Sequence, residues 1–102
     1  MDLVDDPVSI DEYEIWHKNQ WPEVRKGITD SGIESMEIYR TGNRLCMVIE
    51  VDADFSFEKK QEMDIANQKM QEWEQLMWKF QQPLPWAAEN EKWVLMNSIF
   101  KM

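Results

Sequence analysis

The only histidine of the chain, His17, follows Tyr13 by four residues and lies between Trp16 and Trp21. Residues four apart on a helix lie on the same side, so this spacing brings the imidazole close to the phenol. Imidazole is the side chain whose unperturbed pKa allows it to give and take a proton near neutral pH, and a neighbouring phenol can orient it. Aromatic faces can stack on the C–H face of a sugar or another small ring. These residue types therefore suit acid–base chemistry on a small ligand.

The same residues also have a purely structural interpretation. A single histidine near a helix end is usually a surface or capping residue, and tyrosine and tryptophan at helical spacing usually belong to the core. Spacing alone does not decide between a catalytic and a structural histidine.

The helices that would carry this cluster can be predicted from local signals. Residues 1–4 (MDLV) are typical of a short strand, and Ser9 has the spacing of an N-cap for a helix that runs to about Asn19. Pro22 suits the first turn of a second helix, which we expect Gly32 to end. Two short helices are therefore expected between the first strand and the rest of the chain.

The remaining elements follow from hydrophobic periodicity. Alternation from Ile33 onward, with a turn at residues 41–43 (TGN), predicts a β-hairpin. Residues 55–80 return to helical spacing, with a break expected near residues 64–67. Residues 93–100 (WVLMNSIF) are apolar at nearly every position, as is typical of a strand buried on both faces.

This order of elements predicts an α+β fold in one domain, residues 1–102, with a four-stranded antiparallel sheet and helices on one face. The other face of such a sheet would be bare. In a small chain with 6 Trp and 8 Met, a second copy of the chain is the simplest cover for that face, so we expect a homodimer.

Composition excludes several classes of protein. The formal net charge of −9 argues against binding to nucleic acid or to an anionic membrane surface. A single cysteine, Cys46, forms no intramolecular disulfide, and one histidine with scattered acids is a poor metal site, so we expect no metal. No signal segment and no membrane-spanning stretch is present, which favours a cytoplasmic protein.

A longer pattern surrounds the histidine. It reads Y-x3-H-x3-WPE at residues 13–23, and it is followed by Gly32, Ile38-Tyr39, LxxxIE at Leu45–Glu50 and Trp73. In this order the pattern resembles the L-rhamnose mutarotase family over nearly the whole chain. The resemblance implies a ferredoxin-like dimeric α/β barrel and an isomerase that interconverts the α and β anomers of a 6-deoxy-L-hexose without a cofactor.

The resemblance also implies roles for individual residues. His17 matches the catalytic proton donor of the family, Tyr13 matches a tyrosine that contacts the sugar, and Trp73 matches the first of two tryptophans lining the pocket. The second of those tryptophans corresponds to Glu74 here, and a further tyrosine that contacts the sugar corresponds to Met36. These two departures fall on substrate-binding positions, so the preferred sugar could be L-rhamnose or L-fucose.

Ring opening of a sugar needs a second polar group beside the histidine, and Glu50, Glu74 and Tyr39 are the candidates, although each also suits a structural role. Two alternatives to a mutarotase remain open from sequence. One is a small monooxygenase on the same dimeric barrel, and the other is a non-catalytic dimerisation or sugar-binding module.

Overall fold

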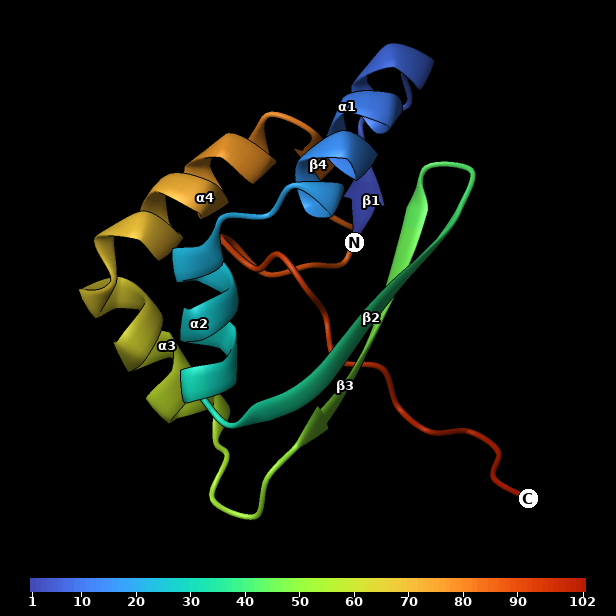
Figure 1. Cartoon of the computed structure of the whole chain (residues 1–102). Coiled ribbons are helices and arrows are strands. Elements are labelled where there is room, and N and C mark those ends of the chain that lie inside the picture. Colours follow the sequence, from blue (N-terminus) through green and yellow to red (C-terminus); the bar gives the residue numbers. More distant parts are fainter.

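The structure, a computed structural model that describes residues 1–102, consists of one antiparallel sheet and a layer of helices. In chain order the elements are β1 (Asp2–Leu3), α1 (Pro7–Lys18), α2 (Pro22–Asp30), β2 (Ile33–Thr41), β3 (Arg44–Val51), α3 (Phe57–Ala66), α4 (Gln68–Trp78) and β4 (Gln81–Gln82). The strands are ordered β2-β3-β1-β4, and each neighbouring pair is antiparallel. All four helices lie on one side of the sheet (Figure 1). The predicted α+β class, the four-stranded antiparallel sheet and the one-sided helical layer are confirmed.

The two helices that follow β1 begin at prolines. Pro7 occupies the first turn of α1, where its fixed φ suits a helix and its missing N–H is not needed. The helix therefore starts two residues before Ser9, and the predicted Ser9 N-cap is wrong. Pro22 opens α2 as predicted, and Gly32 follows its end with φ at +99°. A side chain there would also meet the Asp52 carboxylate at 2.9 Å, so glycine suits this turn for two reasons.

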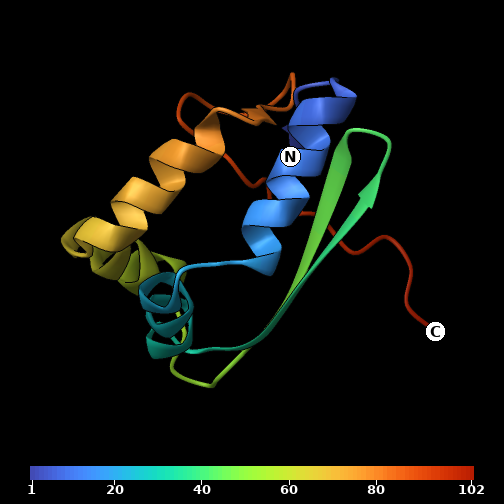
Figure 2. The ribbon, with the colours of Figure 1, turned by 45° about the horizontal axis from the view of Figure 1, so that its top comes forward.

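The hairpin of β2 and β3 is the largest part of the sheet. Its register pairs Thr41 with Arg44 and Met36 with Ile49 across the predicted turn, where Gly42 has a positive φ of 56°. The two long strands lie beside the helical layer in both views (Figure 2). Because side chains alternate along a strand, the hairpin turns one set of residues toward the helices and the other set away from them.

The break in the long helical segment is confirmed at Asn67. This residue ends α3 and begins α4 in an extended conformation, and its side-chain oxygen accepts a hydrogen bond from the Met70 amide at 3.1 Å. An asparagine in this position satisfies a free N–H at the helix start, so the chain can change direction here. The resulting bend lets α4 pack against α2, where Met70 lies close to Gly27.

The fourth strand is not where the sequence predicted it. The strand expected at Trp93–Phe100 is absent, and Gln81–Gln82 pairs with β1 instead, with Leu3 opposite Gln81. The edge of β1 is thus already occupied by the residues directly after α4. Residues 92–102 form no helix or strand, and from Leu95 onward they are exposed. The apolar residues of 93–100 indicated that this segment is buried against another surface, but they did not indicate which surface that is.

The core lies between the sheet and the helices. It contains apolar residues from β1, α1, α2, β3 and α4, among them Leu3, Tyr13, Val24, Leu45 and Trp73. No helix is both long enough and apolar enough to cross a lipid bilayer.

Candidate active site

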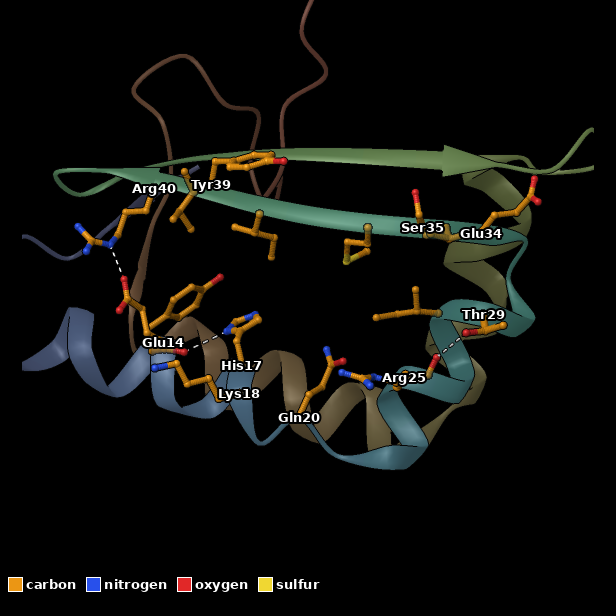
Figure 3. Close-up of a pocket in the computed structure, with 16 residues that line it drawn as sticks. Glu14, His17, Lys18, Gln20, Arg25, Thr29, Glu34, Ser35, Tyr39 and Arg40 are labelled. Carbon is orange, nitrogen blue, oxygen red and sulfur yellow. Dashed lines mark hydrogen bonds and ion pairs between the residues drawn. The ribbon is translucent and has the colours of Figure 1, made fainter.

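Two adjoining cavities lie between the helices and the face of the sheet that is turned toward them. The outer cavity, of about 780 Å³, is bordered by α1, α2 and β2 (Figure 3). The inner cavity, of about 300 Å³, continues toward α4 and β4. Tyr13, His17 and Met36 line both, so the two cavities meet at these side chains.

His17 projects from α1 into this space (Figure 3). Its Nδ1 lies 3.0 Å from the backbone carbonyl oxygen of Tyr13, one turn earlier in the helix. A carbonyl oxygen can only accept, so Nδ1 carries the proton of this hydrogen bond. In the neutral imidazole Nε2 is then the basic nitrogen, and it is not engaged by any group of the chain. The backbone thus orients the ring and leaves one nitrogen free for acid–base chemistry.

Aromatic rings surround this imidazole on two sides. The ring of Tyr13 lies 4.4 Å from it between centroids, and the ring of Trp73 lies 5.5 Å away in an edge-to-face arrangement. Trp73 also contacts Trp16 and Trp21 edge-to-face. The aromatic cluster predicted from the sequence therefore exists, and Trp73, which follows it by more than fifty residues, lies at its centre.

Tyr13 is buried at the junction of the two cavities. Only 3% of its surface is exposed, and burial raises the pKa of its phenol above the ordinary value. The hydroxyl therefore stays protonated near neutral pH. Its oxygen accepts a hydrogen bond from Nε2 of Gln81 at 3.5 Å.

The structure brings together the residues that the sequence assigned to the site. Tyr13, His17, Met36, Trp73 and Glu74 all line the inner cavity. Met36 reaches it from β2 and Glu74 from α4. The two positions at which this chain differs from the pattern of the family it resembles therefore lie on opposite walls of the cavity. Trp73 is only 6% exposed and belongs to the core as well as to the cavity wall.

The other two candidates for a second acid–base group are placed differently. Glu50 is exposed and lines neither cavity, which removes it as a partner of His17. Tyr39 borders only the outer cavity, at β2, but its ring lies on the side of the strand turned away from the helices (Figure 3), and its hydroxyl donates to the Glu37 carboxylate. This hydrogen bond raises the pKa of the Tyr39 phenol. Glu74 is the carboxylate among the three that shares a cavity with His17.

The inner cavity is also lined by four polar residues that the sequence analysis did not single out, namely Gln20, Lys60, Gln81 and Lys92. Gln81 belongs to a stretch, QQPLP, that was interpreted only as the end of a helix. Lys92 donates to the backbone oxygen of Glu74 at 3.1 Å, and its ammonium lies 4.7 Å from the Trp78 ring centroid. Desolvation lowers the pKa of Lys92, with a smaller opposing effect from the charge of Glu74. No local pattern in the sequence indicates Gln81 or Lys92, since each reaches the site only through tertiary folding.

One ion pair joins the two sides of the outer cavity. Nε of Arg40 on β2 lies 2.6 Å from the Glu14 carboxylate on α1 (Figure 3). Both side chains are partly exposed, so the pair contributes little to stability, although it connects α1 to β2 at one end of the cavity. No group of three or more histidine, cysteine or acidic side chains is arranged to hold a metal ion.

Comparison with known proteins gives consistent results over the full length of the chain. A family model described as L-rhamnose mutarotase matches residues 1–102. An L-fucose mutarotase of Xanthomonas campestris pv. campestris is 40% identical over 104 residues, which cover 100% of this chain and 83% of that protein. A UPF0734 protein of Dictyostelium discoideum is 38% identical over 109 residues, which cover 100% of this chain and 85% of that protein.

Proposed function

Since the chain belongs to the L-rhamnose mutarotase family, we propose that its cavities bind a 6-deoxy-L-hexose and that His17 moves the protons of ring opening. The protein is a sugar mutarotase, an isomerase that interconverts the α and β anomers of its substrate. The observation that carries the residue assignment is the position of His17, with Nε2 unengaged, where the two cavities meet. Membership of this family favours the mutarotase function over the two alternatives, a monooxygenase and a non-catalytic module.

The reaction consists of two proton transfers around one bond cleavage. A base removes the proton of the anomeric hydroxyl while an acid protonates the ring oxygen, and the bond between the anomeric carbon and the ring oxygen breaks. The open aldehyde rotates about its C1–C2 bond, and the reverse transfers close the ring on the other face. No electrons or groups are exchanged with a second substrate, so side chains that carry protons are sufficient.

His17 is suited to one of these transfers. Its ring is held by the Tyr13 carbonyl at Nδ1, and Nε2 can accept or deliver a proton. A positioned acid–base group typically accelerates a reaction about 10²–10⁴-fold. That is a useful gain for anomer exchange, which already proceeds in water.

The other side chains of the inner cavity would bind and orient the sugar. Trp73 and Tyr13 offer aromatic surface against a C–H face, and Met36 adds apolar surface from the opposite wall. Glu74 is half-buried in the cavity wall. Its carboxylate can serve as the second acid–base group or accept a hydrogen bond from a sugar hydroxyl. In our proposal these four residues bind substrate and His17 is the catalytic residue.

We further propose that the protein is a homodimer built as a dimeric α/β barrel. Two exposed apolar features support this. The sheet face turned away from the helices carries Tyr39 and Val48, both exposed. The C-terminal segment extends beyond the hairpin (Figure 1) and exposes Leu95, Ile99 and Phe100, with Ile99 96% exposed. Apolar surface of this kind is normally covered, and a second copy provides matching surface. The cytoplasmic location stays a prediction.

Anomer exchange can be followed directly by NMR. Magnetisation transfer between the α and β anomeric protons of L-rhamnose and of L-fucose should be faster with the protein than in buffer. The ratio of the two accelerations would identify the preferred sugar. Exchange of both sugars at the buffer rate would contradict the proposed function.

A further inference from the structure

Gln81 holds an unpaired polar atom inside the site. Its side-chain oxygen Oε1 is buried and has no hydrogen-bond partner, and it is the only buried side-chain nitrogen or oxygen in the structure without one. The residue is 8% exposed. Most buried polar groups are hydrogen-bonded, because burial removes their contact with water. An unpaired amide oxygen in a cavity wall therefore indicates that a bound ligand supplies the missing hydrogen-bond partner.

The strand position of Gln81 explains why its side chain reaches the site. β4 pairs with β1, with Leu3 opposite Gln81, and side chains alternate along a strand. Gln82 is consequently exposed, while Gln81 turns toward the helical layer and lines the inner cavity with His17 and Glu74. The unpaired amide thus belongs to the wall that we assign to the sugar.

The other end of the amide is already held. Nε2 of Gln81 donates to the Tyr13 hydroxyl oxygen at 3.5 Å, so the amide plane is oriented by a residue that is itself buried. Exchanging the two ends of the amide would let the Tyr13 hydroxyl donate to oxygen, but it would leave the nitrogen unpaired instead. In either orientation one end of the amide has no partner within the chain.

We propose that the Gln81 amide binds one hydroxyl group of the sugar and thereby helps to set which 6-deoxy-L-hexose is accepted. A hydroxyl both donates and accepts hydrogen bonds, so it can satisfy either end of the amide. When Nε2 donates to Tyr13, the Tyr13 O–H remains able to donate as well. Gln81 and Tyr13 then present an acceptor and a donor side by side, a pattern that suits a hydroxyl in one orientation at a ring carbon. This inference rests on the proposed function.

Deoxy sugars test the contact one hydroxyl at a time. Rates of anomer exchange would be measured by NMR for the preferred sugar and for its 2-, 3- and 4-deoxy analogues. The proteins would be the wild type, Gln81→Met and the matched control Gln82→Met, which makes the same change at the exposed neighbour. Binding of each sugar would be measured in parallel by calorimetry.

The proposal predicts that the wild type discriminates against one deoxy analogue by about tenfold in kcat/KM, the typical value of one hydrogen bond. Gln81→Met should lose this discrimination at that ring position only, and Gln82→Met should keep it. Because an unpaired amide is replaced by an apolar side chain of similar length, Gln81→Met should melt at or above the wild-type temperature in the absence of sugar. Should Gln81→Met fail to fold, Gln81→Asn withdraws the amide by one methylene and should lose the same discrimination.

Equal discrimination against all analogues in the wild type and Gln81→Met would overturn the inference. A lowered melting temperature of Gln81→Met with unchanged sugar preference would also overturn it, because Gln81 would then only support Tyr13. Failure of the proposed function gives a different result. If the wild type binds sugars without accelerating exchange, the pattern of binding affinities across the analogues still decides the role of Gln81. If the wild type neither binds nor exchanges them, both proposals fall.

Discussion

The rings of His17 and Trp73 meet edge-to-face, with their centroids 5.5 Å apart, although the two residues lie on different helices. This contact places the proposed catalytic group directly against the core, since Trp73 also packs on Trp16 and Trp21. In our proposal, catalysis and stability therefore both depend on Trp73.

Replacement of Trp73 by alanine should be strongly destabilising. Trp73 is 6% exposed, and removal of a buried tryptophan typically costs about 3–5 kcal/mol of the free energy of unfolding. Trp86 is 65% exposed and serves as a matched control, for which Trp86→Ala should stay within about 0.5 kcal/mol of the wild type. Urea denaturation of the two variants measures the difference. Equal stability of the two variants would show that Trp73 is not part of the core.

A second prediction concerns acid stability and the ion pair between β1 and β3. Arg44 donates to both carboxylate oxygens of Asp2, from Nε at 2.9 Å and from Nη2 at 3.2 Å. The hydrogen bonds from Arg44 lower the pKa of Asp2 below its ordinary value of 3.8. The folded state therefore holds the charged carboxylate more strongly than the unfolded state does. This contribution to stability is present in full above pH 3.8 and is lost as the pH falls through the lowered pKa.

Melting temperatures measured across this pH window check the prediction. Arg44→Met should remove the contribution of the pair, so its stability should fall less steeply below pH 3.8 than that of the wild type. Lys26→Met breaks the exposed pair of Lys26 and Asp30 and should keep the wild-type profile. Parallel curves for all three proteins would mean that Asp2 gains nothing from Arg44 in the folded state.

The proposed dimer can be tested through the C-terminal segment. Phe100→Glu places a charge among the exposed apolar side chains of residues 95–102 and should shift the protein from dimer to monomer. Val8→Glu is the control, because Val8 is also exposed and apolar but lies on α1. Light scattering at micromolar concentration gives the mass of each variant. A monomeric wild type, or a Phe100→Glu variant that is as dimeric as Val8→Glu, would contradict this interface.

Local signals were enough to predict most elements of the fold. The turn at residues 41–43 and the alternation on either side fixed the hairpin, and Asn67 lies at the expected helix break. The fourth strand was placed wrongly because its pairing depends on which segment lies beside β1 in the folded chain, and that segment, Gln81–Gln82, is too short to show periodicity. The position of a strand in this sheet depends on tertiary contacts, and the pattern of residues 93–100 could not predict those contacts.

The candidate site could likewise be predicted only in part from local patterns in the sequence. The spacing of four between Tyr13 and His17 was sufficient to bring them together on one helix face. Trp73, Glu74 and Met36 could be assigned only through the resemblance to a family, because they come from α4 and β2. Gln81 was missed, since its contact with Tyr13 joins residues 68 positions apart in the chain.

The carboxylate of Glu74 should affect which sugar is preferred. Glu74→Leu removes an acceptor from the inner cavity, and we expect the ratio of kcat/KM for L-rhamnose to that for L-fucose to change by about tenfold. Glu72→Leu is the control on the same helix, because Glu72 is exposed and pairs only with Lys69 at 3.3 Å. If Glu74→Leu keeps the wild-type ratio, its carboxylate does not contact a hydroxyl by which the two sugars differ.

The most direct measurement compares anomer exchange by the wild type and by His17→Gln in the same NMR experiment. Glutamine keeps a polar group of similar size but cannot carry a proton near neutral pH. Exchange by His17→Gln should fall at least about 100-fold while sugar binding stays measurable, and Glu12→Gln, an exposed change on the same helix, should keep the wild-type rate. Wild-type exchange in His17→Gln would contradict the central claim that His17 moves the protons of ring opening.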